Sequence, residues 1–296
     1  MSSKSFEWLV ARRFRDSLRL LLAPLCTLLM AEAATATPAQ PVASSATTTR
    51  GAARGAMGGR GETAGESEPA VKNAKEALSG AAKVKREASG KQGEEKLAAL
   101  MAAVKAYETV ASDHAAVVVV AAEARFRAGE VWRTLKHDED SRRAFTAVTA
   151  LAKGAPTWAA RAWLELGHAD RRAKKLDDAL VSYTRVLTVV PEQRRECVQA
   201  LSWQGKTLLE QKNDKEGHAT LLAAGTRYPE FPLDDIKNVD RVASDWIKAG
   251  RVVEARELLA DLDEKHGKPD EGETEVEPAI VRALQRMKVR ELLAAK

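Results

Sequence analysis

Cysteine is scarce in this chain of 296 residues, which contains only Cys26 and Cys197. Cys26 lies in an N-terminal segment that we expect to be removed, so Cys197 is left alone and no intramolecular disulfide can form. A chain of this length can bury a sizeable core and does not need disulfides for its stability. We expect Cys197 to be a small packing residue rather than a reactive thiol.

The residue patterns of catalytic and metal sites are also missing. No two of the five histidines stand four residues apart, so the His-Glu-x-x-His zinc pattern is absent. The sequence contains neither the glycine-rich loop that holds phosphates nor the Gly-x-Ser-x-Gly turn that presents a nucleophilic serine. We therefore expect a protein that is not an enzyme and that needs no cofactor or metal ion.

No apolar run is long enough to cross a bilayer. The longest, Leu20–Ala31, covers about a dozen residues and contains Pro24, whereas a membrane-spanning helix needs roughly 20. Four arginines from residue 12 to residue 19 precede this run, and the small residues up to Ala33 and Ala36 follow it. This order of basic, apolar and small segments is typical of a secretory signal peptide. We predict that residues 1–36 are a signal peptide and that the protein is exported to the periplasm or cell envelope of a bacterium.

Two alternatives to simple cleavage remain for this segment. An uncleaved segment would anchor the protein in the membrane as a structural tether, with its helices facing the envelope space. The mass of the intact protein separates this alternative from cleavage, because an anchored protein retains Met1. Lipidation at Cys26 is disfavoured, since Leu25 stands where such processing needs a small residue.

Residues 37–68 are rich in Ala, Thr, Ser, Pro and Gly and contain almost no large apolar side chain. They cannot bury enough surface to offset the entropy lost on ordering, so we predict a disordered linker. Two dipeptides within it, Arg50-Gly51 and Arg54-Gly55, are similar to the Arg-Gly segments of nucleic-acid-binding tails. A cytoplasmic nucleic-acid binder is therefore a third hypothesis, and it requires the N-terminus to be retained.

A large apolar residue recurs at a fixed interval of 38 positions in the rest of the chain. The series is Tyr107, Phe145, Tyr183, Leu221 and Leu259. Four residues before each of them stands a small residue, in the series Ala103, Ser141, Ala179, Gly217 and Ala255. A small residue lets two helices approach closely, and the bulky residue one turn later fills the space beside that contact. The interval therefore predicts one helix-packing unit that is repeated five times.

The clearest copy of this unit lies in residues 163–191. Its marker residues are Trp163, Leu166, Gly167, Ala179, Tyr183 and Pro191. In type and spacing this copy resembles the tetratricopeptide repeat (TPR), although Asp170 stands at a Tyr position of the family and Tyr183 at a Phe position. The resemblance implies a first helix with the Trp and Leu-Gly and a second helix with the Ala and the aromatic residue. Gly167 leaves no side chain where the two helices nearly touch, and Pro191 cannot continue a helix.

Weaker copies on both sides extend the resemblance over roughly residues 70–266, so we predict an all-α, right-handed α-solenoid of about five TPR-like helical hairpins. The family period is about 34 residues, and four more residues add about one helical turn, which nearly preserves the buried face. We expect the first helix between Ala70 and Arg86, before the helix that carries Tyr107. The segment Val117–Val120 favours a strand by propensity, but its flanking alanines and the repeat frame predict a helix.

The predicted organisation follows from these segments. It comprises a signal peptide (1–36), a disordered linker (37–68), the helical repeat domain (69–266), an acidic loop (267–276) and a C-terminal capping helix (277–296). The last segment spaces its apolar residues along one helical stripe among charged residues. A solenoid needs such a helix to cover the apolar surface of its last repeat.

The resemblance also implies a binding surface, because in TPR proteins the first helix of each pair lines the concave side on which partners bind. The family's binding positions fall here on Arg127, Glu130, Arg133, Arg161, His168, Arg171, Arg172, Gln199, Trp203, Lys206, Lys237, Arg241 and Lys248. Most are basic, so we expect a mildly cationic groove for an acidic or extended peptide segment of an envelope protein. The asparagines of the family's clamp for a peptide's terminal carboxylate are lacking. In the alternative interpretation, charges such as Arg171, Arg172, Lys174 and Lys175 only keep the helix turns soluble.

Tryptophan positions and net charge refine this expectation. Trp132, Trp163 and Trp246 fall on core positions of the repeat frame, whereas Trp203 is expected on the exposed side of its helix. The chain has a formal net charge of +5 at pH 7, and removal of residues 1–36, with five basic and three acidic residues, leaves +3. This excess is too small to indicate nucleic-acid or membrane binding by itself.

Overall fold

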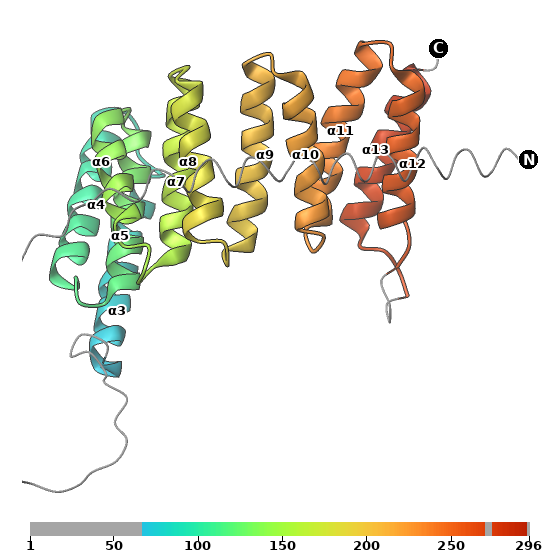
Figure 1. Ribbon diagram of the computed structural model, residues 1–296. Coiled ribbons are helices and arrows are strands. Elements are labelled where there is room, and N and C mark those ends of the chain that lie inside the picture. The colour runs from blue at the N-terminus through green and yellow to red at the C-terminus, as the bar shows by residue number, and fades with distance from the viewer. Residues whose placement is uncertain (1–66, 270–273, 295–296) are drawn as a thin grey trace, which may run out of the picture. The chain divides into compact units, whose positions relative to one another are not determined.

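The computed structural model describes residues 67–269 and 274–294 (Figure 1). These residues form eleven α-helices and no strand. The predicted signal peptide and nearly all of the predicted linker lie outside the described residues. None of the described helices combines the length and the apolar character that a membrane span requires.

Ten of the helices pair into five hairpins that follow one another along the chain (Figure 1). The pairs are α3 (Glu68–Glu87) with α4 (Gly93–Asp113), α5 (Val118–Thr134) with α6 (Asp138–Thr149), α7 (Pro156–Arg172) with α8 (Leu176–Val189), α9 (Arg194–Glu210) with α10 (Asp214–Arg227), and α11 (Pro232–Lys248) with α12 (Val252–His266). Helix α13 (Pro278–Ala294) packs on α11 and α12. The all-α solenoid of about five hairpins with an end helix is confirmed. The valines that favour a strand begin helix α5.

The second and third hairpins close at the large residues that the 38-residue interval marks. A Cβ atom on Gly167 would lie 2.5 Å from Cε1 of Tyr183, and one on Gly129 would lie 2.8 Å from Cε1 of Phe145. The side chain of Tyr183 is fully buried. In the second hairpin, the hydroxyl of Ser141 also donates a hydrogen bond of 2.9 Å to the carbonyl oxygen of Gly129. The repeated small and large residues therefore mark the closest approach of paired helices.

The turn inside the hairpin also repeats in the four hairpins from α5 to α12. Lys136, Lys174 and Lys212 have positive φ angles of 62°, 61° and 65°, and Gly250 has a φ of 78° at the same place in the last hairpin. After Lys136, the amide of His137 donates a hydrogen bond of 3.0 Å to the carbonyl oxygen of Trp132, which ends helix α5. This is the bond of a Schellman cap, whose left-handed residue is usually glycine. Three of the four turns thus carry lysine where glycine fits best.

Consecutive hairpins pack mainly through the second helix of one hairpin and the first helix of the next, and their first helices also contact each other. Helix α3 contacts α5, α5 contacts α7, α7 contacts α9, and α9 contacts α11. Among the described residues, no two of the second helices α4, α6, α8, α10 and α12 contact each other. The layer of first helices is therefore the more closely spaced of the two, as the concave side of a curved stack must be. This layer is the surface on which the binding positions were predicted.

Candidate functional site

All of the predicted binding residues lie on first helices. They are Arg127, Glu130 and Arg133 on α5, Arg161, His168, Arg171 and Arg172 on α7, Gln199, Trp203 and Lys206 on α9, and Lys237, Arg241 and Lys248 on α11. Because these helices contact one another in sequence, the residues share one layer of the stack. Several of the cations gather around two tryptophans, Trp158 and Trp203.

Many of the predicted cations are already paired with a carboxylate of the next hairpin. Arg133 pairs with Glu165 between α5 and α7. Nε of Arg161 lies 3.0 Å from Oε1 of Glu196 on α9. Nε of Arg171 lies 2.7 Å from Oε1 of Glu210, also on α9. These arginines therefore join neighbouring first helices, and a charge reversal at Arg161 or Arg171 would disturb the stack as well as any bound partner.

Sequence reasoning missed the carboxylates in these pairs. Glu165, Glu196 and Glu210 follow their arginines by 32, 35 and 39 residues, close to one repeat. An acidic residue about one repeat after each arginine is a signal that a search for cross-repeat charge pairs can find. Whether such an acidic residue pairs with the arginine depends on how successive first helices contact each other, which the sequence does not specify.

Trp158 is the centre of the first group of cations. The guanidinium carbons of Arg127 and Arg161 lie 5.2 Å and 5.0 Å from the centroid of its ring. The ring itself is 9% exposed and packs at 5.2 Å against Phe126. Arg127 also forms ion pairs within its own helix. These two cations are therefore fixed in place by aromatic and acidic neighbours.

Trp203 is the centre of the second group, which we call the Trp203 cluster and which consists of His168, Arg171, Trp203 and Lys206. Nζ of Lys206 lies 4.4 Å from the centroid of the Trp203 ring, and the guanidinium carbon of Arg171 lies 4.7 Å from it. The His168 ring meets it edge-on at 4.7 Å. A cation near an aromatic ring at this distance is attracted by the electrons of the ring. Trp203 thus holds two cations from adjacent hairpins side by side.

Lys206 differs from most of its neighbours because it has no ion pair in the part of the chain that the structure describes. Burial lowers the pKa of Lys206, and the positive charges of Arg171, Lys237 and Arg241 lower that pKa further, against the opposing charge of Asp234. Lys237 likewise has no ion pair among the described residues. A half-buried cation beside like charges is unfavourable until an anion joins it. The surroundings of Lys206 therefore fit an anionic group from outside the chain.

His168 does not contribute a charge to this surface at neutral pH. Burial, helped by the charges of Arg172 and Arg171, lowers the pKa of His168 to about 4. Its Nδ1 atom lies 2.8 Å from the hydroxyl of Tyr183, the large residue of the same hairpin. His168 is therefore a neutral residue that connects the Trp203 cluster to the core of its hairpin.

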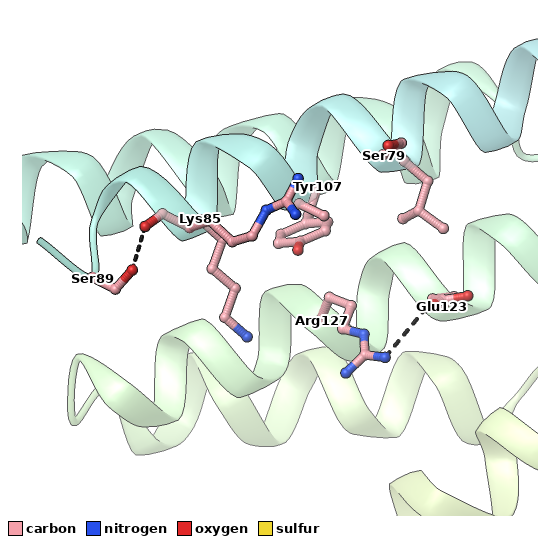
Figure 2. Close-up of a pocket in the computed structure, with 9 residues that line it drawn as sticks. Ser79, Lys85, Ser89, Tyr107, Glu123 and Arg127 are labelled. Atoms are coloured by element: carbon pink, nitrogen blue, oxygen red, sulfur yellow. Dashed lines mark hydrogen bonds and ion pairs between the residues drawn. The ribbon is translucent and has the colours of Figure 1, made fainter.

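A pocket of about 550 Å³ opens beside the first hairpin (Figure 2). Its lining comes from α3, the turn after it, α4 and α5, and consists of Leu78, Ser79, Ala82, Lys85, Arg86, Ser89, Tyr107, Glu123 and Arg127. Only Arg127 was predicted as a binding residue. The family's binding positions were not carried over to α3, because the repeat signature is weakest there.

Known proteins resemble this chain in structure only. No protein-family model and no curated protein matches the sequence. The solved structure of RapI in its apo form superimposes with a TM-score of 0.50 at 15% sequence identity, over 69% of this chain and 56% of RapI. The fold is a TPR-like α-solenoid. The TPR-like solenoid of this chain spans little more than half the length of RapI.

A second solved structure is less similar to this TPR-like solenoid. It is a variant of a putative kinesin light chain from Podosopora anserina, described as having nearly identical TPR-like repeats. It matches with a TM-score of 0.46 and 11% identity over 66% of this chain and 94% of that one. At such identities the comparisons concern the fold alone.

Two further observations describe the chemistry of the solenoid. Cys197 is fully buried, and burial raises the pKa of its thiol, so it packs in the core. Over the ranges 67–269 and 274–288, no group of three or more His, Cys, Asp and Glu side chains is placed to hold a metal ion.

Proposed function

We propose that this protein is a non-enzymatic scaffold that binds another protein along its layer of first helices. The observation that carries the proposal is Lys206, a half-buried cation of the Trp203 cluster with like charges around it and no ion pair among the described residues. A carboxylate from a partner would relieve this repulsion and form a charge-assisted hydrogen bond. The surface therefore favours an acidic segment of a partner.

The rest of the layer supports an extended segment rather than a small molecule. The Trp158 group lies on α5 and α7, and the Trp203 cluster lies on α7 and α9, so the two cationic groups are on successive hairpins. Lys237 and Arg241 on α11 continue the series. An extended peptide with acidic residues can meet these positions in turn.

The proposed location is the bacterial envelope, with a role in the assembly of an envelope or outer-membrane complex. The support for it is the order of basic, apolar and small residues in segment 1–36. An uncleaved anchor that tethers the solenoid to the membrane is the alternative from the same segment. A cytoplasmic nucleic-acid binder is the alternative from the Arg-Gly dipeptides of the linker.

The test is mild crosslinking in the native cells, followed by purification of a C-terminally tagged copy and mass spectrometry. The N-terminus of the tagged protein is read in the same run. We expect a defined set of envelope proteins and an N-terminus near Ala34 or Thr37. Envelope proteins together with an intact Met1 would favour the anchored tether, and RNA-associated proteins with Met1 would overturn the proposal.

A further inference from the structure

The hydroxyl group of Tyr107 opens into the pocket beside the first hairpin. The residue is 2% exposed, and its hydroxyl is directed toward the space between Lys85 and Arg127 (Figure 2). Tyr183, at the same place two hairpins later, has His168 as a neighbour 2.8 Å from its hydroxyl. The Tyr107 hydroxyl has no hydrogen-bond partner among the described residues. No buried side-chain nitrogen or oxygen of the described residues lacks a partner, so this hydroxyl is open to the pocket, where a ligand can accept its hydrogen bond in place of water.

Small residues of α3 stand at the edge of the pocket. Ser79 and Ala82 line it, and a Cβ atom on the intervening Gly80 would meet no atom within 4 Å. At the next junction, between α5 and α7, the rings of Phe126 and Trp158 pack against each other at 5.2 Å. The small residues of α3 thus leave an open space that the packing of the helices does not need.

The charges around the pocket leave one cation unbalanced. Nζ of Lys85 lies 3.7 Å from Oε2 of Glu130, and Arg127 lies 3.0 Å from Glu130 and 3.4 Å from Glu123. Three cations, Lys85, Arg86 and Arg127, therefore face two carboxylates. Arg86 has no ion pair in the described part of the chain. The balance fits a ligand with one negative charge.

We propose that this pocket binds a carboxylate on a short aliphatic stem, with the Tyr107 hydroxyl donating a hydrogen bond to it and Arg86 balancing its charge. The stem lies against Leu78 and Ala82, the apolar part of the lining. Two sources present this chemistry: a glutamate side chain in a partner's peptide segment and a free short-chain carboxylic acid. The pocket is separate from the Trp203 cluster on α7 and α9, so it stands independently of the proposed scaffold function.

The tyrosine ring signals in the NMR spectrum test this site directly. The chain has three tyrosines, so selective ¹³C labelling gives a signal for Tyr107 and two internal controls, Tyr183 and Tyr228. The full chain is titrated with acetyl-Gly-Glu-Gly-amide, with the isosteric Gln peptide, and with butyrate. We expect the Glu peptide or butyrate to shift the Tyr107 signal saturably, with no shift from the Gln peptide. A response to the Glu peptide alone assigns a partner segment, and a response to butyrate alone assigns a free acid.

Substitutions then separate binding from packing. Tyr107→Phe keeps the ring, as Phe145 does in the next hairpin, and removes only the hydroxyl. With backbone amide signals of α3 as the readout, we expect Tyr107→Phe and Arg86→Gln each to weaken binding by roughly three- to tenfold, as for one lost hydrogen bond. Tyr183→Phe should leave the dissociation constant unchanged. Equal shifts from the Glu and Gln peptides, no shift of Tyr107, or full affinity in both pocket variants would overturn the proposal.

Discussion

The ammonium group of Lys206 lies 4.4 Å from the centroid of the Trp203 ring, three residues earlier on helix α9. The same ring has Arg171 of the preceding hairpin at 4.7 Å. Trp203 therefore keeps two cations close together on the first-helix layer, although their charges repel each other. Removal of the ring should release Lys206, whereas Arg171 keeps its ion pair with Glu210. This relationship connects the stack of hairpins to the proposed binding of acidic segments.

The first prediction concerns the response of stability to pH at His168. Its folded pKa of about 4 lies below the ordinary value of 6.5, so the unfolded chain binds a proton first as the pH falls. The stability that neutral His168 provides is present above pH 6.5 and is lost between there and pH 4. Between pH 7.5 and pH 5 the loss is about 2 kcal/mol. Urea unfolding of the wild type and of His168→Gln should show the smaller pH dependence in the variant.

His137 serves as the matched control for that experiment. Its side chain is half exposed and lies beside Asp140 in the turn before α6. His137→Gln should keep nearly the whole pH dependence of the wild type. If the unfolding free energies of His168→Gln and His137→Gln depended equally on pH, the assignment of His168 as a buried neutral residue would be wrong.

The second prediction concerns the lysines in the left-handed turns. Lys174→Gly should raise the free energy of unfolding by about 1 kcal/mol, because glycine adopts a positive φ without the strain of a side chain. The neighbouring Lys175 has a φ of −86°, so Lys175→Gly should lower stability by about 0.5–1 kcal/mol. Chemical denaturation of both variants measures the difference. A stabilising Lys175→Gly, or a destabilising Lys174→Gly, would contradict this account of the turn.

The third prediction concerns the contact between paired helices. Gly167→Ala places a methyl group 2.5 Å from Tyr183, so the helices must separate, and we expect a loss of roughly 1–3 kcal/mol. Gly80→Ala is the control, since its added carbon meets nothing within 4 Å and should stabilise helix α3 by about 1 kcal/mol. Thermal and urea unfolding report both changes. Equal effects of the two substitutions would show that the close contact does not limit the hairpin.

Much of the fold was predictable because its closest contacts depend on residue size at a fixed interval. Gly167 and Tyr183 lie less than half a repeat apart in sequence and meet in space, at the helix contact that the resemblance to the tetratricopeptide repeat implied. The left-handed lysines were not predicted, because the usual sign of such a turn is glycine and only Gly250 carries it. Lys136, Lys174 and Lys212 keep the turn by their place in the repeat alone.

The positions of the candidate binding residues were predictable, but the pairing of their charges was not. The family pattern placed Arg161 and Arg171 on first helices, yet it gave no indication that Glu196 and Glu210 already pair with them. Trp203 was expected on the exposed side of its helix, and the structure places it half-buried between cations. The pocket at Tyr107 was not predicted, since it arises from space that small residues of α3 leave open. Whether a charge is paired depends on contacts between hairpins, which a single sequence does not encode locally.

The most direct test of the central claim compares partner capture by two charge-reversed variants. Lys206→Glu combined with Lys237→Glu removes two cations that have no ion pair among the described residues, whereas Lys215→Glu changes an exposed cation on the second helix α10. In the tagged crosslinking experiment, we expect the double variant to capture at least about tenfold less of the envelope partner than the wild type does. The Lys215→Glu protein should capture as much as the wild type. Equal capture by all three proteins would contradict binding on the first-helix layer.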